Sequence, residues 1–133
     1  MPTCLSDPTK ADQLYPVPPS TNFMDAAFIP ATDVERIANL LIDNYDELTA
    51  LDAFAIKYLW AKKGGLSHGK AKLGSCERPA GKLAYFTGGI DFLIVLSADH
   101  CRDMRLSRLQ VEALVYHELL HAQDRAGDPG RDQ

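Results

Sequence analysis

The segment "ALVYHELLHAQD" (residues 113–124) constrains the fold of this 133-residue chain more than any other stretch of its sequence. Just before it, Ser107 and Gln110 form the pattern of a capping box, which predicts a helix over about Arg108–Asp124. Leu119 and Leu120 make the middle of this helix apolar, so one of its faces must pack against another layer of the protein. We therefore expect a domain built around a partly buried C-terminal helix.

The same helix carries the frame H-E-x-x-H through His117, Glu118 and His121. Histidines four residues apart lie one above the other on one face of a helix, so both imidazoles can bind one metal ion. Zinc suits two neutral imidazoles with a third ligand and a water molecule. In such motifs the glutamate is the base for the metal-activated water, and hydrolysis of a peptide bond follows. The motif predicts His117 and His121 as metal ligands and Glu118 as the catalytic residue.

A third metal ligand is harder to assign from the sequence. Gly127 stands six residues after His121, so the chain lacks the H-x-x-G-x-x-H continuation of the metzincins. Asp128 is our candidate because the helix should end before it, and Asp124 lies near the same helix face. A two-histidine site completed by water or by another chain stays open. The weaker candidates, which more often have structural roles, are Asp132, His68, Asp99, His100 and Cys101.

The other apolar segments predict a small sheet. Residues 53–63 and 70–76 have strand composition and flank a glycine-rich turn, so we predict that they pair as a hairpin with a long loop. Residues 91–98 form a continuous apolar run of strand length, which indicates a central or well-covered strand.

The N-terminal part of the chain predicts an arm followed by a scaffold helix. Six of the eight prolines lie in residues 1–31, so we expect this segment to be an irregular arm. Thr32 and Glu35 have capping-box spacing at the start of a helix that we expect over Asp33–Leu48. The fold class is α+β: residues 32–133 form one domain, with a mostly antiparallel or mixed three-stranded sheet packed on the scaffold helix and the C-terminal helix.

Residues 57–82 hold seven bases and one acid, although the chain as a whole has a net charge of −4. Such a segment is usually a solvated surface, but it can also face phosphates or an acidic partner. The candidate patch for a partner or a nucleic acid consists of Lys62, Lys63, Lys70 and Lys72. Tyr58 and Trp60 lie nearby and could stack on bases, although aromatic residues in strands more often belong to the core.

Several classes of protein are excluded by the sequence. No apolar run approaches the roughly 18 residues of a membrane span, and the N-terminus lacks the basic and apolar regions of a secretory signal. The three cysteines are odd in number and irregularly spaced, which indicates reduced thiols. The segment "KKGGLSHGK" does not have the frame of a phosphate-binding loop. We expect a cytoplasmic protein without a membrane partner, and nothing in the sequence indicates an oligomeric state.

Three segments together resemble the putative phage metallopeptidase domain of bacteriophages and prophages. They are "IKYLWAKKGGLSHGKAKLG" (Ile56–Gly74), "DFLIVLSAD" (Asp91–Asp99) and "LSRLQVEALVYHELLH" (Leu106–His121). The resemblance covers about residues 33–124 and extends, more distantly, to SprT-like zinc proteases. It implies a minimal zincin-like fold, a Zn²⁺ cofactor, a protein or peptide substrate such as a host protein, and a location in the cytoplasm of the host bacterium.

The end of the chain departs from this family pattern. In the family a further histidine follows the helix in an acidic segment, whereas this sequence ends with "DRAGDPGRDQ". We therefore expect a zinc metallopeptidase domain truncated at its C-terminus. A second hypothesis is a catalytically degenerate zincin-fold phage protein, which binds a bacterial host or defence component, or nucleic acid through residues 57–82.

Overall fold

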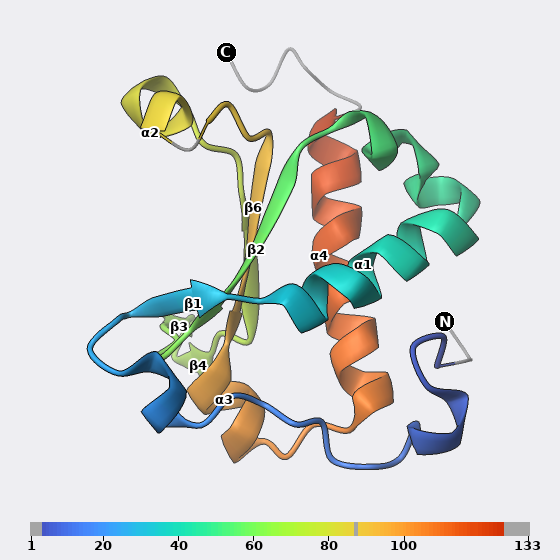
Figure 1. The fold of residues 1–133 in the computed structure, drawn as a ribbon, viewed down its shortest axis with the longest axis vertical. Helices are drawn as coiled ribbons and strands as arrows, with labels where there is room; N and C mark the ends of the chain where they lie inside the picture. Colours follow the sequence, from blue (N-terminus) through green and yellow to red (C-terminus); the bar gives the residue numbers. More distant parts are fainter. Residues whose placement is uncertain (1–3, 87, 127–133) are drawn as a thin grey trace.

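The computed structural model describes residues 4–86 and 88–126 and contains a mixed four-stranded sheet in the order β1-β2-β6-β5 (Figure 1). The strands are β1 (Phe28–Pro30), β2 (Ile56–Ala61), β5 (Gly74–Glu77) and β6 (Phe92–Ser97). β2 and β6 are parallel, whereas β1 and β5 are antiparallel to their neighbours. The predicted α+β class is confirmed, but this sheet has four strands where we predicted three.

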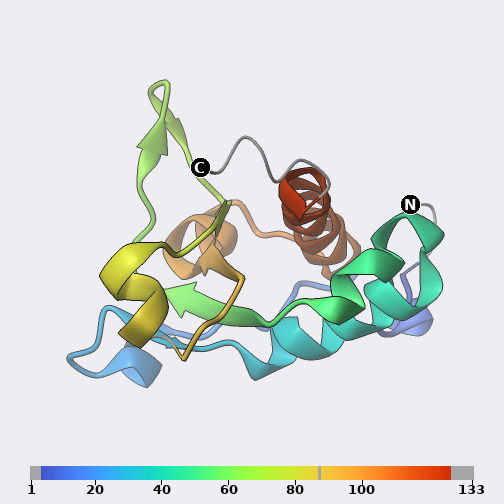
Figure 2. The same cartoon turned by 90° about the horizontal axis from the view of Figure 1, so that it is seen from above.

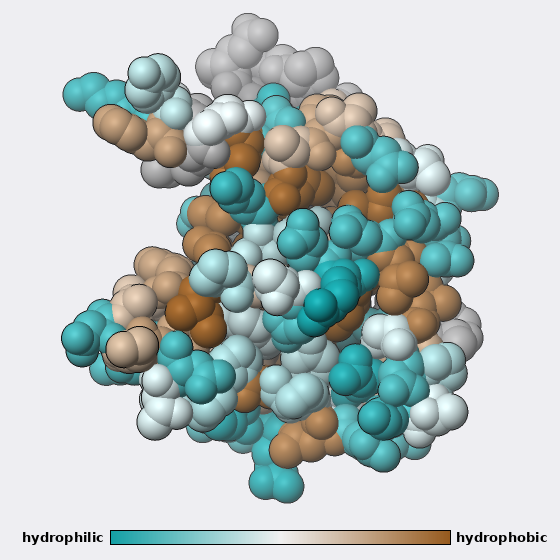
Figure 3. Space-filling view, viewed as in Figure 1, coloured by the Kyte–Doolittle hydropathy of each residue, from teal (hydrophilic) through white to brown (hydrophobic). Residues whose placement is uncertain are grey.

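Two helices, α1 (Thr32–Asn44) and α4 (Arg108–Ala126), lie against the same face of the sheet (Figures 1 and 2). Alternate residues of β6 point into this core, and Phe92, Ile94 and Leu96 are all fully buried. The opposite face of the sheet is more open, and Figure 3 shows a hollow between the projecting α2 (Gly81–Phe86) and the β1 region. The remaining elements are the 3-10 helices η1 (Pro8–Lys10), η2 (Ser20–Phe23) and η3 (Asp46–Ala53), strands β3 (Leu66–Ser67) and β4 (Lys70–Ala71), and helix α3 (Ala98–Asp103).

The predicted hairpin between residues 53–63 and 70–76 is wrong. β2 pairs with β6 rather than with β5, and β5 also pairs with β6. The most apolar strand therefore takes a central position and separates the two segments, which confirms the prediction for residues 91–98. The lysine- and glycine-rich stretch between them forms a small hairpin of its own, in which β3 and β4 pair outside the main sheet.

Part of the N-terminal arm is regular, contrary to our prediction of an irregular segment. β1 adds to the edge of β2 with Ile29 opposite Trp60, and Pro30 occupies the end of this edge strand. The predicted cap at Thr32 is also wrong, because α1 begins at this residue and no side chain caps its first turn. α1 ends at Asn44 and is followed by η3, whereas we predicted a helix that reaches Leu48.

The capping box of α4 is confirmed. The backbone N–H of Gln110 donates to Ser107 Oγ at 3.2 Å, and the N–H of Ser107 donates to Gln110 Oε1 at 2.8 Å. These two bonds satisfy donors at the helix terminus that have no partner within the helix. α4 continues to Ala126, two residues beyond the predicted end. Among the described residues, no helix has both the length and the apolar character of a membrane span.

The start of the arm is tied to α4 through Glu112, whose side chain is fully buried. The thiol of Cys4 donates to its carboxylate at 2.6 Å and the hydroxyl of Ser6 at 2.7 Å. The backbone N–H groups of Leu5 and Ser6 donate to the same carboxylate at 3.0 and 3.1 Å. A buried carboxylate is stable only when its oxygens have such partners, so these bonds hold residues 4–6 against α4.

Candidate metal centre

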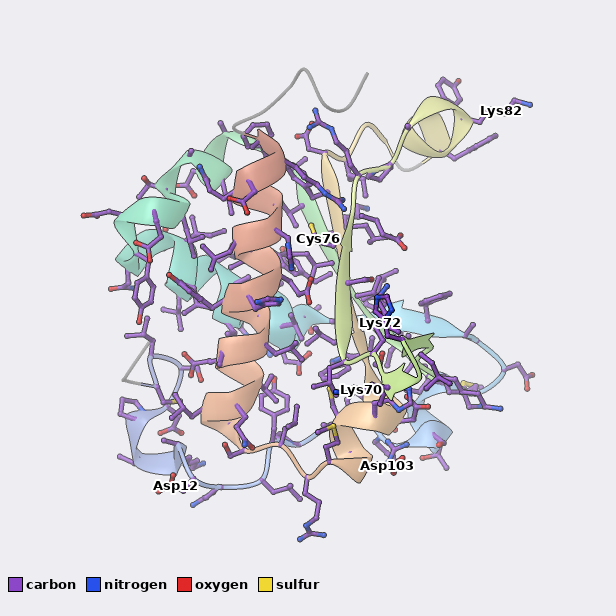
Figure 4. The ribbon with its side chains drawn as sticks, turned by 180° about the vertical axis from the view of Figure 1, so that it is seen from behind. Asp12, Lys70, Lys72, Cys76, Lys82 and Asp103 are labelled. Atoms are coloured by element: carbon purple, nitrogen blue, oxygen red, sulfur yellow. The ribbon has the colours of Figure 1, made fainter. Side chains whose placement is uncertain are left out.

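The H-E-x-x-H frame lies in the second half of α4, beside the edge strand β5 (Figure 4). Val115, Leu119 and Ala122 are buried on the core side of this part of the helix. His117 and His121 are exposed. The helix therefore anchors itself through its apolar side and presents both imidazoles to solvent, where an ion and a substrate can reach them.

The two imidazoles approach each other closely. Nε2 of His117 lies 3.0 Å from Nε2 of His121, and the rings meet edge to face at 85°. A tetrahedral zinc ion with Zn–N distances of about 2.0–2.1 Å holds two nitrogens about 3.3 Å apart. The pair therefore needs to separate by only a few tenths of an ångström to bind one ion. The geometry of His117 and His121 fits two ligands of a zinc site.

Glu118 points away from solvent toward β5, and only 4% of it is exposed. Its Oε2 would lie 3.2 Å from a Cβ atom placed on Gly74, and the same Cβ would lie 2.9 Å from Cδ2 of Leu96. Position 74 therefore leaves room for the carboxylate only because it is a glycine. Gly74 carries no local signal in the sequence, because its partner Glu118 lies far along the chain on α4.

Opposing effects act on the protonation of Glu118. Burial raises the pKa of its carboxyl group, because desolvation disfavours the charged form. Coulombic interactions with His117, His121, Lys72 and Arg125 act in the opposite direction, and the net pKa of Glu118 remains above the ordinary value of a glutamate. A carboxylate of this kind is a stronger base than an exposed one and suits general base catalysis near neutral pH.

The edge of β5 presents backbone groups toward α4. The N–H of Ser97 donates to the carbonyl of Leu73 at 2.8 Å, which fixes the alternation of this antiparallel pair. By that alternation, the backbone N–H and C=O groups of Gly74 and Cys76 point away from β6. Arg125 Nη1 donates to the carbonyl of Cys76 at 2.8 Å, which agrees with this direction. An extended peptide can thus pair with the edge of β5 at Gly74, next to the carboxylate of Glu118.

The described part of the chain contains no group of three His, Cys, Asp or Glu side chains placed to hold a metal ion. Asp124 is exposed on α4 and joins no such group. Asp128, our candidate for the third ligand, and Asp132 lie outside the described residues, so their role stays a prediction.

The other candidate ligands have structural surroundings. Asp99 Oδ1 accepts hydrogen bonds from the backbone N–H groups of Gly64 and His100 at 2.8 and 2.7 Å. Cys101 is fully buried, which raises its pKa to about 12. His68 is exposed in the turn between β3 and β4, with a φ of 53°. None of these residues lies with His117 and His121 in a metal-binding group of the described chain.

The basic segment is arranged around the β3–β4 hairpin. Lys70 begins β4 and Lys72 follows it. Lys63, Lys70 and Lys72 are exposed and Lys62 is half-buried. Tyr58 and Trp60 are only 7% and 1% exposed, so they belong to the core and cannot stack on bases.

The comparisons with known proteins give one result. A family profile described as "Putative phage metallopeptidase" matches residues 26–133. No curated protein and no solved structure matches the chain. The matched residues include α4 and its neighbouring strand β5, whereas the part of the arm that Glu112 holds lies before residue 26.

Proposed function

The chain belongs to the putative phage metallopeptidase family, and from this premise we propose that it is a zinc-dependent peptidase whose general base is Glu118. The observation that carries the proposal is the pair of Nε2 atoms of His117 and His121, 3.0 Å apart and beside a buried carboxylate. A metal, a base and room for a substrate are the three parts that such a reaction requires.

His117 and His121 would hold the metal, and Asp128 is the proposed third ligand. Zinc, when bound there, would supply a Lewis acid that polarises the scissile carbonyl group and makes water more acidic. The donor set suits zinc because neutral imidazole nitrogens with a carboxylate oxygen are common ligands of this ion. The exposed position of both histidines leaves access for water and for a carbonyl oxygen.

Glu118 would move the proton. As the water oxygen attacks the carbonyl carbon, the carboxylate accepts a proton from the water. It then donates this proton to the nitrogen of the leaving amine while the C–N bond breaks, so that the base is regenerated. The burial of Glu118 supports both proton transfers, because it raises the pKa of the carboxyl group toward neutral pH.

The edge of β5 would align the substrate. A peptide in extended conformation can add to this edge through the outward-facing backbone groups of Gly74. The scissile bond would then lie between β5 and α4, within reach of Glu118. Backbone pairing of this kind is independent of the substrate's side chains, so it supports a peptide substrate without naming its sequence.

A comparison of wild type with Glu118→Gln tests the proposal. Both proteins are loaded with zinc, their metal content is measured, and cleavage of a loosely folded protein is followed by mass spectrometry. We expect both to bind zinc and the variant to lose about a hundredfold or more in rate, the size of effect expected for a lost general base. Glu77→Gln, which removes an exposed carboxylate from β5, is the control and should remain active. Equal rates for wild type and Glu118→Gln would refute the assignment.

One observation favours a second function, a degenerate zincin-fold protein that binds a bacterial host or defence component. Only two of the ligands that zinc requires come together in the described residues. A protein that folds and binds a host protein tightly without zinc, and that cleaves no substrate with zinc, would support this second function.

A further inference from the structure

α4 packs against one face of the sheet, whereas the β3–β4 hairpin projects beyond the edge of β5, and β5 continues directly from the hairpin (Figures 1 and 2). Figure 4 shows Lys70 and Lys72 on this segment, with Cys76 further along β5 between the sheet and α4. The hairpin therefore stands at one end of the edge strand on which we propose that the substrate pairs. A side chain of the substrate that leaves the site in this direction meets the hairpin.

Several hydrogen bonds hold the base of the hairpin in place. The hydroxyl of Ser97 donates to the carbonyl of Lys72 at 2.7 Å, and the N–H of Lys72 donates to the carbonyl of Gly65 at 3.0 Å. The N–H of Gly64 donates to Asp99 at 2.8 Å. A Cβ atom on Gly64 would lie only 2.2 Å from Ser97 Oγ, so the close contact of these segments requires glycine. The backbone that carries Lys72 is thus fixed relative to the sheet.

Lys72 lies two residues before Gly74, in the short segment that leads from the hairpin into β5. Residues two apart on an extended strand share a face, so Gly74 and Cys76 lie on one side of β5. Gly74 contacts the carboxylate of Glu118, and Cys76 is buried beside α4. In agreement, the positive charge of Lys72 acts on Glu118 and lowers its pKa against the effect of burial. Lys70 extends the same cationic surface outward along the hairpin.

We propose that Lys70 and Lys72 select acidic polypeptide substrates, by binding Asp or Glu side chains that lie beside the scissile bond. This inference rests on the proposed peptidase function and names its substrate class. Both lysines are exposed and directly precede β5, so a carboxylate of a peptide paired on β5, two or three residues from the scissile bond, can reach them. Their long side chains suit a mobile carboxylate better than one fixed geometry.

The charges favour a polypeptide over a nucleic acid. The chain has a net charge of −4, which repels an extended phosphate backbone outside this segment. An exposed carboxylate, Glu77, lies on β5 a few residues from the lysines. The two aromatic residues of β2 that could stack on bases, Tyr58 and Trp60, are buried. A short acidic stretch matches this local surface, whereas a nucleic acid requires a wider one.

Two measurements test the inference with the full chain. The first compares kcat/KM for two blocked peptides of equal length, one with Glu and one with Gln at the same positions among alanine and leucine. The second measures binding of both peptides to the Glu118→Gln protein by fluorescence anisotropy, with a single-stranded DNA oligonucleotide as competitor. Each uses the double variant Lys70→Gln/Lys72→Gln and the matched control Lys57→Gln/Lys82→Gln. The control removes the same charge from exposed residues of β2 and α2, and Figure 4 shows Lys82 on α2, away from the hairpin.

We expect the Glu peptide to be preferred at low ionic strength, and the preference to fall about three- to twentyfold in the hairpin variant, as for two exposed ion pairs. The control should keep the preference. Three results would overturn the inference: equal kcat/KM and equal binding for the Glu and Gln peptides, an equal loss of the preference in the control variant, or tighter binding of the oligonucleotide through the same lysines. If wild type cleaves neither peptide, the proposed function fails, and the binding measurement still decides whether the hairpin selects acidic chains.

Discussion

Replacement of Gly74 by alanine tests the contact between β5 and α4. The added Cβ would lie 2.9 Å from Cδ2 of Leu96, 3.2 Å from Oε2 of Glu118 and 3.3 Å from the carbonyl oxygen of Val95. Leu96 is fully buried and the carbonyl belongs to the paired strand, so neither can move freely. Overpacking of this kind costs about 1–3 kcal/mol of the free energy of unfolding. Alanine also lowers the conformational entropy of the unfolded chain, which stabilises the folded state by about 0.4–1 kcal/mol. We therefore expect the free energy of unfolding to fall by about 1–2 kcal/mol.

Gly65→Ala is the matched control, because no atom lies within 4 Å of the Cβ position at this glycine. It should leave the stability unchanged or slightly higher. Urea unfolding of the zinc-free proteins measures both effects, and a loss of 2 kcal/mol lowers the midpoint by about 1 M at an unchanged slope. Gly74→Ala should also lower the peptidase rate, because the added Cβ would displace the carboxylate of Glu118 by a few tenths of an ångström. If Gly74→Ala proves as stable as Gly65→Ala, the described contact of β5 with Glu118 is wrong.

Three further predictions concern the buried acids and the thiols. Glu112→Ala leaves the hydrogen-bond donors of Cys4, Leu5 and Ser6 without their acceptor. We expect its free energy of unfolding, measured with urea, to fall by about 3–5 kcal/mol. Glu35→Ala, at an exposed site on α1, is the control and should lose far less stability. The three cysteines are buried and the pKa values of their thiols are raised, so the native protein should react slowly with a thiol reagent such as DTNB. In Glu112→Ala the thiol of Cys4 should become accessible and react rapidly. Fast reaction of the wild-type thiols would contradict their burial. Because the pKa of Glu118 is raised in the folded, zinc-free protein, ionisation of this residue opposes folding above the ordinary glutamate pKa and not below it. Glu118→Gln should therefore be more stable than wild type at pH 7, with a difference that disappears as the pH falls below that ordinary value; a pH-independent difference would refute the burial of this carboxyl group.

Local patterns in the sequence were sufficient for the parts of the fold that local interactions determine. The capping box at Ser107 and Gln110 predicted the start of α4, since both partners lie within one helical turn. The apolar run at residues 91–98 predicted a central strand, because such a strand is covered on both sides by neighbours. The spacing of His117 and His121 predicted imidazoles on one helix face, which the structure shows at 3.0 Å.

Long-range pairing was the part that the sequence could not show. β5 pairs with β6 rather than with β2, because the choice depends on which strand occupies the centre of the sheet. Glu112 and Gly74 gave no local signal, since their partners lie more than 40 residues away on the arm and on α4. The predicted cap at Thr32 failed because capping spacing alone does not fix where the chain enters a helix.

Zinc binding by the pair of histidines is the most direct test of the central claim. Isothermal titration of the zinc-free protein with Zn²⁺, together with X-ray absorption of the loaded protein, measures the affinity, the stoichiometry and the number of nitrogen ligands. We expect one zinc ion per chain with two imidazole nitrogens at about 2.0–2.1 Å, and loss of binding in His117→Ala and His121→Ala. Binding that is absent in wild type, or that both variants retain, would contradict the account.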